Sequence, residues 1–238
     1  MNKLRLTTLA DGIFAIVMTL MVLNLKVPEL IGLVSSQKLW SALLMLTPAF
    51  VSYILSFAVL TNYWMAHHYV VSIYAQNIDR RLIFWNMSFL MAISLIPFSA
   101  HLLGSYVTTP LSIWFFSLHI IVIGALLHHL FYYTLRATNI RNSSAITQKD
   151  IQLTYIRIFI PPICAVLAVY LSFFNTKVSI YFLVFAVVFN LLPGVLHRLD
   201  RILGTLLTKQ AIQKRVLSVR VQTSRNHKKV AKVAWVIK

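Results

Sequence analysis

Long stretches without a charged residue divide the chain, and they predict helices that cross a membrane. Asp, Glu, Lys and Arg are absent from residues 12–25, 39–78 and 82–135, which are 14, 40 and 54 residues long. A helix needs about 20 apolar residues to cross the hydrocarbon core of a bilayer. A single helix of 54 residues would be far longer than the bilayer is thick, so this stretch must fold back on itself. Gly104 and Pro110 mark the turn.

The remaining uncharged stretches complete the set of predicted spans. Residues 158–176 and 178–197 are free of charge over 19 and 20 residues. The first span can begin near Leu4 if Asp11 is tolerated inside the membrane. We therefore predict an all-α polytopic membrane protein with six transmembrane helices per subunit. The spans are expected at residues 4–25, 39–67, 82–103, 111–135, 155–174 and 178–197.

Composition supports this class and excludes others. Hydrophobic residues make up 59% of the 238 residues and charged residues only 11%, against roughly 25% charged in soluble domains. A soluble fold could not cover so much apolar surface, and a disordered chain would be far more polar. The single cysteine, Cys164, excludes a disulfide scaffold.

The strong positive charge predicts orientation more than it predicts a nucleic-acid partner. The chain has 22 basic and 5 acidic residues, a net charge of +17. With the N-terminus in the cytoplasm, nineteen of the 22 basic residues lie on the cytoplasmic side, and Lys26, Lys38 and Lys177 lie outside. This asymmetry predicts a multi-pass protein of the cell membrane with both termini in the cytoplasm. We expect the lipid bilayer as partner and no nucleic acid.

The same pattern divides the chain into a transmembrane domain, residues 1–197, and a basic cytoplasmic tail, residues 198–238. The tail carries eleven basic residues and one acid, Asp200, with apolar residues between them. Two interpretations stay open: a solvated anchor that sets the topology, or a surface helix on anionic lipid. No cleavage site follows residues 4–25, so we expect the first span to be retained.

No enzyme signature accompanies these spans. A Gly-rich phosphate loop, HExxH, GxSxG and CxxC are all absent from the sequence, as is the TVGYG filter of ordinary potassium channels. Neighbouring histidines on a helix point about 100° apart, which makes the pairs at 67–68 and 128–129 poor chelators. We expect no enzyme, no metal site and no cofactor, with haem or metal binding between helices as the open alternative.

Asp11 is the most unusual residue of the first span. An ionised carboxylate in a membrane costs about 3 kcal/mol at the centre and needs a partner. Arg5 is six residues away and does not face Asp11 on one helix. Trp64, His67 and His68 reach a similar depth on the second span, so an indole or imidazole could donate to the carboxylate. The alternative is that Asp11 is shallow enough to be hydrated.

A second side of the first span is purely apolar. Ile16, Leu20 and Leu23 follow the i, i+4, i+7 spacing and form one stripe, about 140° around the axis from Asp11. In a lone helix such a stripe faces lipid or a protein core. In a symmetric oligomer the same stripe can line an axis as a hydrophobic constriction. Thr19 borders the stripe and could present its hydroxyl to a partly dehydrated ion.

These residues resemble the first span of the transmembrane protein 175 family, which comprises the lysosomal potassium channel and its short prokaryotic relatives. The family motif is an Arg, three residues and then Phe-Ser-Asp, and Arg5 and Asp11 occupy its charged positions. Leu9-Ala10 replaces Phe-Ser, and Asn24 stands where relatives often carry an acid. Further similarity lies at residues 63–68, 79–81, 86 and 96–99.

The resemblance implies a tetramer of six-helix subunits whose first helices line the pore. It implies a hydrogen-bond network of Arg5, Asp11, Trp64 and His67. The family builds its pore constrictions from apolar side chains of the first helix, and these map onto the stripe of Ile16, Leu20 and Leu23. Thr19 maps next to the constriction, where it is expected to help selectivity.

Three functional hypotheses follow. The first is a homotetrameric passive cation channel, permeable to potassium or other monovalent cations. The second is a secondary transporter or proton-linked permease that uses Asp11 and His67, although broken helices and inverted repeats are not visible in the sequence. The third is a membrane enzyme or haem protein that uses its histidines.

Overall fold

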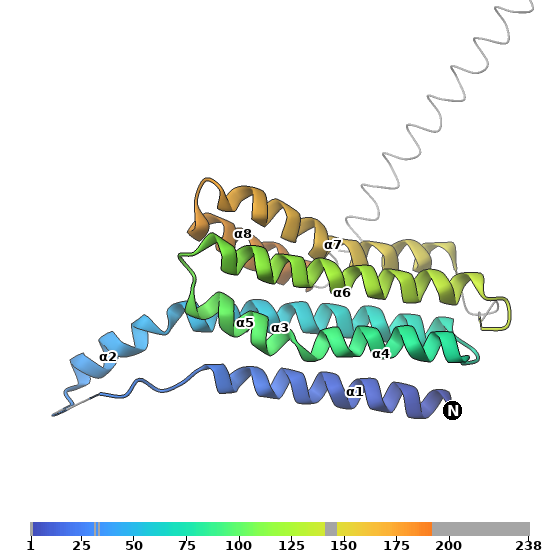
Figure 1. The fold of residues 1–238 in the computed structure, drawn as a ribbon, viewed down its shortest axis with the longest axis horizontal. Helices are drawn as coiled ribbons and strands as arrows, with labels where there is room; N and C mark the ends of the chain where they lie inside the picture. The colour runs from blue at the N-terminus through green and yellow to red at the C-terminus, as the bar shows by residue number, and fades with distance from the viewer. Residues whose placement is uncertain (1, 31, 33, 141–146, 192–238) are drawn as a thin grey trace, which may run out of the picture. The chain divides into compact units, whose positions relative to one another are not determined.

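The computed structural model describes residues 2–30, 32, 34–140 and 147–191, and their regular elements are all helical (Figure 1). In chain order these elements are α1 (Lys3–Leu20), the 3-10 helix η1 (Met21–Asn24), α2 (Ser36–Met45), α3 (Thr47–His68), the π-helix η2 (Tyr69–Tyr74), α4 (Arg80–Ser94), α5 (Ile96–Ser105), α6 (Pro110–Arg136), α7 (Gln148–Ser172) and α8 (Thr176–Leu191).

The predicted class, an all-α polytopic membrane protein, is confirmed. Five helical segments are long and apolar enough to cross a bilayer: Lys3–Asn24, Thr47–Tyr74, Arg80–Ser105, Pro110–Arg136 and Asp150–Ser172. A sixth apolar helix, Thr176–Val188, is shorter. The predicted end of the sixth span at 197, the boundary at 197–198 and the whole basic tail lie outside the described residues.

The second span differs from its expected range, 39–67. The helix is interrupted at Leu46, and the apolar span runs from Thr47 to Tyr74. Pro48 at the start of α3 explains the interruption, because proline has no backbone N–H and cannot continue the preceding helix. Pro97 acts in the same way between α4 and α5, which are interrupted at Leu95.

Polar side chains satisfy helix ends and proline sites. Asp79 caps α4 by accepting a hydrogen bond from the Leu82 N–H at 2.7 Å. Pro161 in α7 leaves the Arg157 carbonyl without its helical donor. The buried Asn62 amide of α3 donates to that carbonyl at 3.0 Å, and the Asn190 amide of α8 donates to Asn62 Oδ1 at 2.8 Å. This chain of bonds joins three helices.

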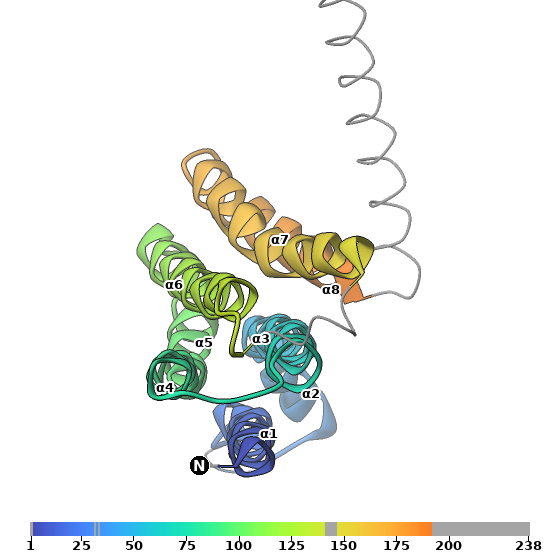
Figure 2. The same ribbon diagram turned by 90° about the vertical axis from the view of Figure 1, so that its right-hand side faces the viewer.

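The hydrophobic core draws more residues from α3 and α6 than from any other helix, and α1, α4, α5, α7 and α8 add to it. Gly124 of α6 permits a close approach, since a Cβ there would lie 2.5 Å from Pro162 Cγ. The Tyr63 hydroxyl donates to the Ile120 carbonyl at 2.8 Å beside this contact. α1, in contrast, packs against α3 and α4 at one edge of the bundle (Figure 2). One side of α1 is therefore left without a contact among the described residues.

Candidate functional site

α1 has one buried stripe and one free face. The buried side chains recur every three or four residues and continue into η1: Leu6, Ala10, Phe14, Val17 and Met21. The apolar stripe predicted as a constriction lies on the free face, where Ile16, Leu20 and Leu23 are 59%, 44% and 66% exposed. These three side chains are open to lipid, to water or to another subunit.

Thr19 is exposed beside this stripe. Its hydroxyl lies 3.0 Å from the Ala15 carbonyl and 2.8 Å from the Ile16 carbonyl, so its proton is directed to its own helix. The lone pairs of the hydroxyl oxygen are left as acceptors. An oxygen acceptor beside an apolar stripe is suited to contact a cation.

The free face carries an open groove of about 500 Å³ along the first turns of α1. Arg5 and Gly12 line it with apolar residues such as Leu9 and Ile16. A Cβ placed on Gly12 would meet nothing within 4 Å. The groove therefore leaves room for close approach by a second helix.

Asp11 has a partner on a different helix. The Trp64 indole N–H of α3 donates to Asp11 Oδ1 at 2.9 Å, and the His68 ring lies 6.2 Å from the Trp64 ring. Arg5 is exposed, and in the described part of the chain no hydrogen bond or ion pair joins it to Asp11. The six-residue spacing accounts for this, since the two side chains leave the helix in different directions.

His67 turns away from Asp11 and into the bundle. Its Nε2 lies 2.6 Å from Asn86 Oδ1 of α4, so Nε2 must carry the proton, because the amide oxygen can only accept. The ring is buried and stacks on Phe89, with centroids 5.3 Å apart. Of the four residues predicted to form one network, the structure thus joins Asp11 with Trp64, while His67 bonds to Asn86.

Two further tethers of α1 were not predicted. Lys3 Nζ donates to the Ser72 carbonyl in η2 at 2.7 Å, and the Asn24 amide donates to the Pro97 carbonyl of α5 at 3.2 Å. Both acceptors lie where helical pairing is irregular, in a π-helix and next to a helix break. The sequence shows a polar residue at each end of this apolar span, which suggests that each side chain has a partner. It does not reveal the partner, because each backbone acceptor lies about 70 residues away in sequence.

The described residues hold no group of three or more His, Cys, Asp or Glu side chains that could bind a metal ion. The polar side chains around α1 form hydrogen bonds that attach it to neighbouring helices, while its exposed face is apolar. Together with the apolar spans, this arrangement defines a multi-pass helical membrane protein.

Comparison with known proteins identifies the relatives. Residues 5–97 match the family described as the endosomal/lysosomal potassium channel TMEM175, so the resemblance predicted from the sequence is confirmed over the first three spans. That family consists of channels and not of enzymes. Over this segment the chain is similar to the TMEM175 channels.

Individual relatives agree with this match. A potassium channel of Chamaesiphon minutus is 38% identical over 111 residues, which cover 44% of this chain and 51% of that protein. A potassium channel of Streptomyces collinus is 37% identical over 102 residues, 43% and 48% of the two chains. The mouse endosomal/lysosomal proton channel TMEM175 is 25% identical over 175 residues, 71% of this chain and 34% of the mouse protein.

The similarity in structure extends further than that in sequence. The crystal structure of a lysosomal potassium-selective channel TMEM175 homolog from Chamaesiphon minutus superposes with a TM-score of 0.66 at 25% identity. The superposition covers 79% of this chain and 95% of that one. By sequence, the chain spans about half the length of the first curated relatives it matches.

Proposed function

We propose that the chain is the subunit of a passive cation channel, permeable to potassium, whose pore is lined by α1. The observation that carries the proposal is the exposed apolar face of α1, within the segment that matches a channel family. Only one stripe of this membrane-spanning helix is buried within the described chain. Its other face can therefore line the symmetry axis of an oligomer.

The constriction is formed by Ile16, Leu20 and Leu23, contributed by each subunit. Rings of isoleucine and leucine expel water from a narrow neck and so restrict ion flow by dewetting. Thr19 supplies an oxygen acceptor at the same depth, which compensates an ion for part of its lost hydration. Selectivity by this means is modest, because one hydroxyl replaces few of the water ligands.

Of the motif residues Arg5, Asp11, Trp64 and His67, the bonded pair Asp11–Trp64 holds α1 in its rotational setting. His67 supports α1 through other contacts, and Arg5 lines the groove on the free face. The Trp64–Asp11 bond supports this role, because it fixes one side of α1 against α3 while the apolar stripe lies on another. His67 supports this setting from the bundle interior. It contacts Asn86 of α4 and packs on Phe14 of α1, with 6.1 Å between the ring centroids.

The assembly is a homotetramer in the cell membrane, with both termini in the cytoplasm. Four copies of α1 around one axis enclose a pathway, whereas one copy leaves its free face without a partner. The orientation rests on the nineteen basic residues assigned to one side. Its partners are monovalent cations, potassium above all, and the surrounding lipid.

The test is ion flux in liposomes that contain the purified protein. Vesicles loaded with potassium, with sodium or with a proton gradient measure each permeability separately. Ile16→Asn and Leu23→Asn should raise potassium flux several-fold, because a polar ring keeps the neck wet. Leu118→Asn is the matched control, since Leu118 of α6 is 60% exposed and Ile16 is 59% exposed.

Equal potassium flux in wild type, Ile16→Asn and Leu23→Asn would place the pathway elsewhere. A wild-type flux that needs an opposing proton gradient would instead support the proton-linked permease. That alternative needs a proton path between Asp11 and His67, and the structure gives these residues different partners, Trp64 and Asn86.

A further inference from the structure

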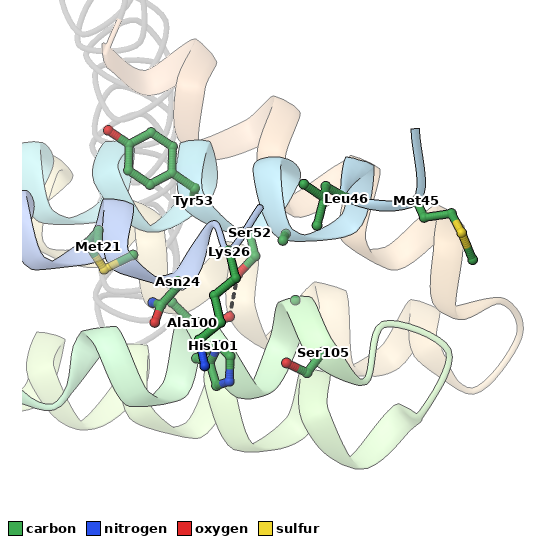
Figure 3. Close-up of a pocket in the computed structure, with 12 residues that line it drawn as sticks. Met21, Asn24, Lys26, Met45, Leu46, Ser52, Tyr53, Ala100, His101 and Ser105 are labelled. Carbon is green, nitrogen blue, oxygen red and sulfur yellow. Dashed lines mark hydrogen bonds between the residues drawn. The ribbon is translucent and has the colours of Figure 1, made fainter. Parts of the chain in front are cut away.

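A cavity of about 400 Å³ lies behind the C-terminal end of α1, on the side away from the free face (Figure 3). Three parts of the chain enclose it: η1 with the residues that follow it, the interruption between α2 and α3, and the last turns of α5. In the proposed topology this end faces outward, at the level where the spans end and lipid headgroups begin.

The charge of this cavity is positive. Lys26 and His101 line it, and no Asp or Glu is among its lining residues. Figure 3 shows the Lys26 side chain extending toward the His101 ring. Within the described residues, neither the ammonium nor the imidazole makes a hydrogen bond or ion pair. Two donors thus share a concave site whose lining has no carboxylate.

Helix ends do not account for this charge. The cavity is bounded by the N-terminal turn of α3, at Leu46 and Ala49, and by the C-terminal turn of α5, at Gly104 and Ser105. The C-terminal ends of η1 and α2 also lie at the cavity, so the helix dipoles provide no net positive end there. Any attraction for an anion therefore comes from the side chains of Lys26 and His101.

Apolar side chains also line the cavity. Met21, Met45 and Leu46 line it, so the site suits a ligand that joins an anion to a hydrocarbon part. The volume is within the range of small-molecule sites, roughly 300–1,000 Å³. We propose that this cavity binds a phosphate group, with Lys26 Nζ and the His101 imidazole as its donors, and that the phosphate belongs to an anionic lipid headgroup or to a free ion.

A ligand in this cavity would contact the same segment that carries Leu20 and Leu23, through the neighbouring residues Met21 and Asn24. Asn24 also holds η1 to the Pro97 carbonyl. An effect of the ligand on ion flow rests on the proposed function, whereas the binding itself does not.

The test counts lipids retained by the purified full chain in native mass spectrometry. Dioctanoyl phosphatidylglycerol is the anionic probe, and dioctanoyl phosphatidylcholine is the neutral comparison. The first phosphatidylglycerol should bind about tenfold or more weakly to the double variant Lys26→Gln, His101→Gln than to wild type. Lys177→Gln is the matched control, an exposed lysine in the first turn of α8, and should bind as wild type does.

Excess inorganic phosphate separates the two sources. If it displaces phosphatidylglycerol from wild type, the free ion occupies the site; if it does not, the lipid headgroup does. Equal phosphatidylglycerol binding by wild type and the double variant would overturn the proposal. The single variant Lys26→Glu provides a second check, because reversing an exposed charge should abolish the same binding step without disturbing the core. These results do not depend on flux, so they stand or fail apart from the channel proposal.

Discussion

Two tryptophans make hydrogen bonds of the same length in different places. Trp64 donates to Asp11 at 2.9 Å between α3 and α1, and Trp114 donates to the Ser172 hydroxyl at 2.9 Å between α6 and α7. The two indoles are 38% and 37% exposed. They differ in what they hold, since Trp64 bonds to α1, the helix proposed to line the pore, and Trp114 does not.

Trp64→Phe is expected to lower flux several-fold, because α1 loses the bond that fixes its rotation. The stability cost should be about 1 kcal/mol, the size measured for hydrogen bonds between membrane helices. Trp114→Phe should cost a similar amount in thermal unfolding and leave flux as in wild type. A Trp64→Phe protein with wild-type flux would show that the bond has no part in setting the pore face.

Among the helices, α7 depends most on side chains from its neighbours. Its proline pair removes two backbone donors, and the Asn62 amide replaces the donor to the Arg157 carbonyl. Asn190 in turn occupies the Asn62 oxygen. A buried carbonyl without a donor is costly in a membrane, where water is absent. The polar pair thus allows a proline-containing helix to stay in the core.

Asn62→Ala should lower the free energy of unfolding by about 1–3 kcal/mol, because it leaves a buried carbonyl and the Asn190 amide unsatisfied. In a Pro161→Ala background the cost should be smaller, since the restored backbone N–H reaches the Arg157 carbonyl. Unfolding in mixed micelles measures all four proteins of this cycle. Pro97→Ala is the control background, in which the full cost should remain. Identical costs in both backgrounds would contradict the role given to Asn62.

The number and type of helices follow from charge-free stretches, because lipid tolerates charges poorly. The interruption at Leu46 does not follow from that pattern, since residues 39–78 are uncharged on both sides of it. The donor to Asp11 was among the candidates, because an indole at matching depth can be inferred from helix length. Asn86 as the partner of His67 was not, since pairing between buried amides and rings depends on helix rotation.

At the scale of the whole molecule, the free face of α1 predicts an assembly. The groove beside Gly12 is open along several turns, and small residues allow helices to approach closely in lipid. We therefore expect copies of the chain to associate through this face.

Native mass spectrometry in detergent should give four copies of the 27.2 kDa chain. Gly12→Leu should yield smaller species, because the added side chain fills the groove while meeting nothing within the subunit. Ala125→Leu, at an exposed position of α6, should retain the wild-type mass. A monomeric wild-type protein, or an unchanged mass for Gly12→Leu, would count against assembly through this face.

Three side-chain bonds attach α1 and η1 at their beginning, middle and end: Lys3 to Ser72, Asp11 to Trp64, and Asn24 to Pro97. Sliding this segment along its axis by one helical turn, about 5.4 Å, would break all three together. Changes in the rotamers of Ile16 and Leu23 break none of them. In the proposed pore, we therefore expect side-chain torsions, on the nanosecond scale, to set the width of the passage rather than translation of the backbone.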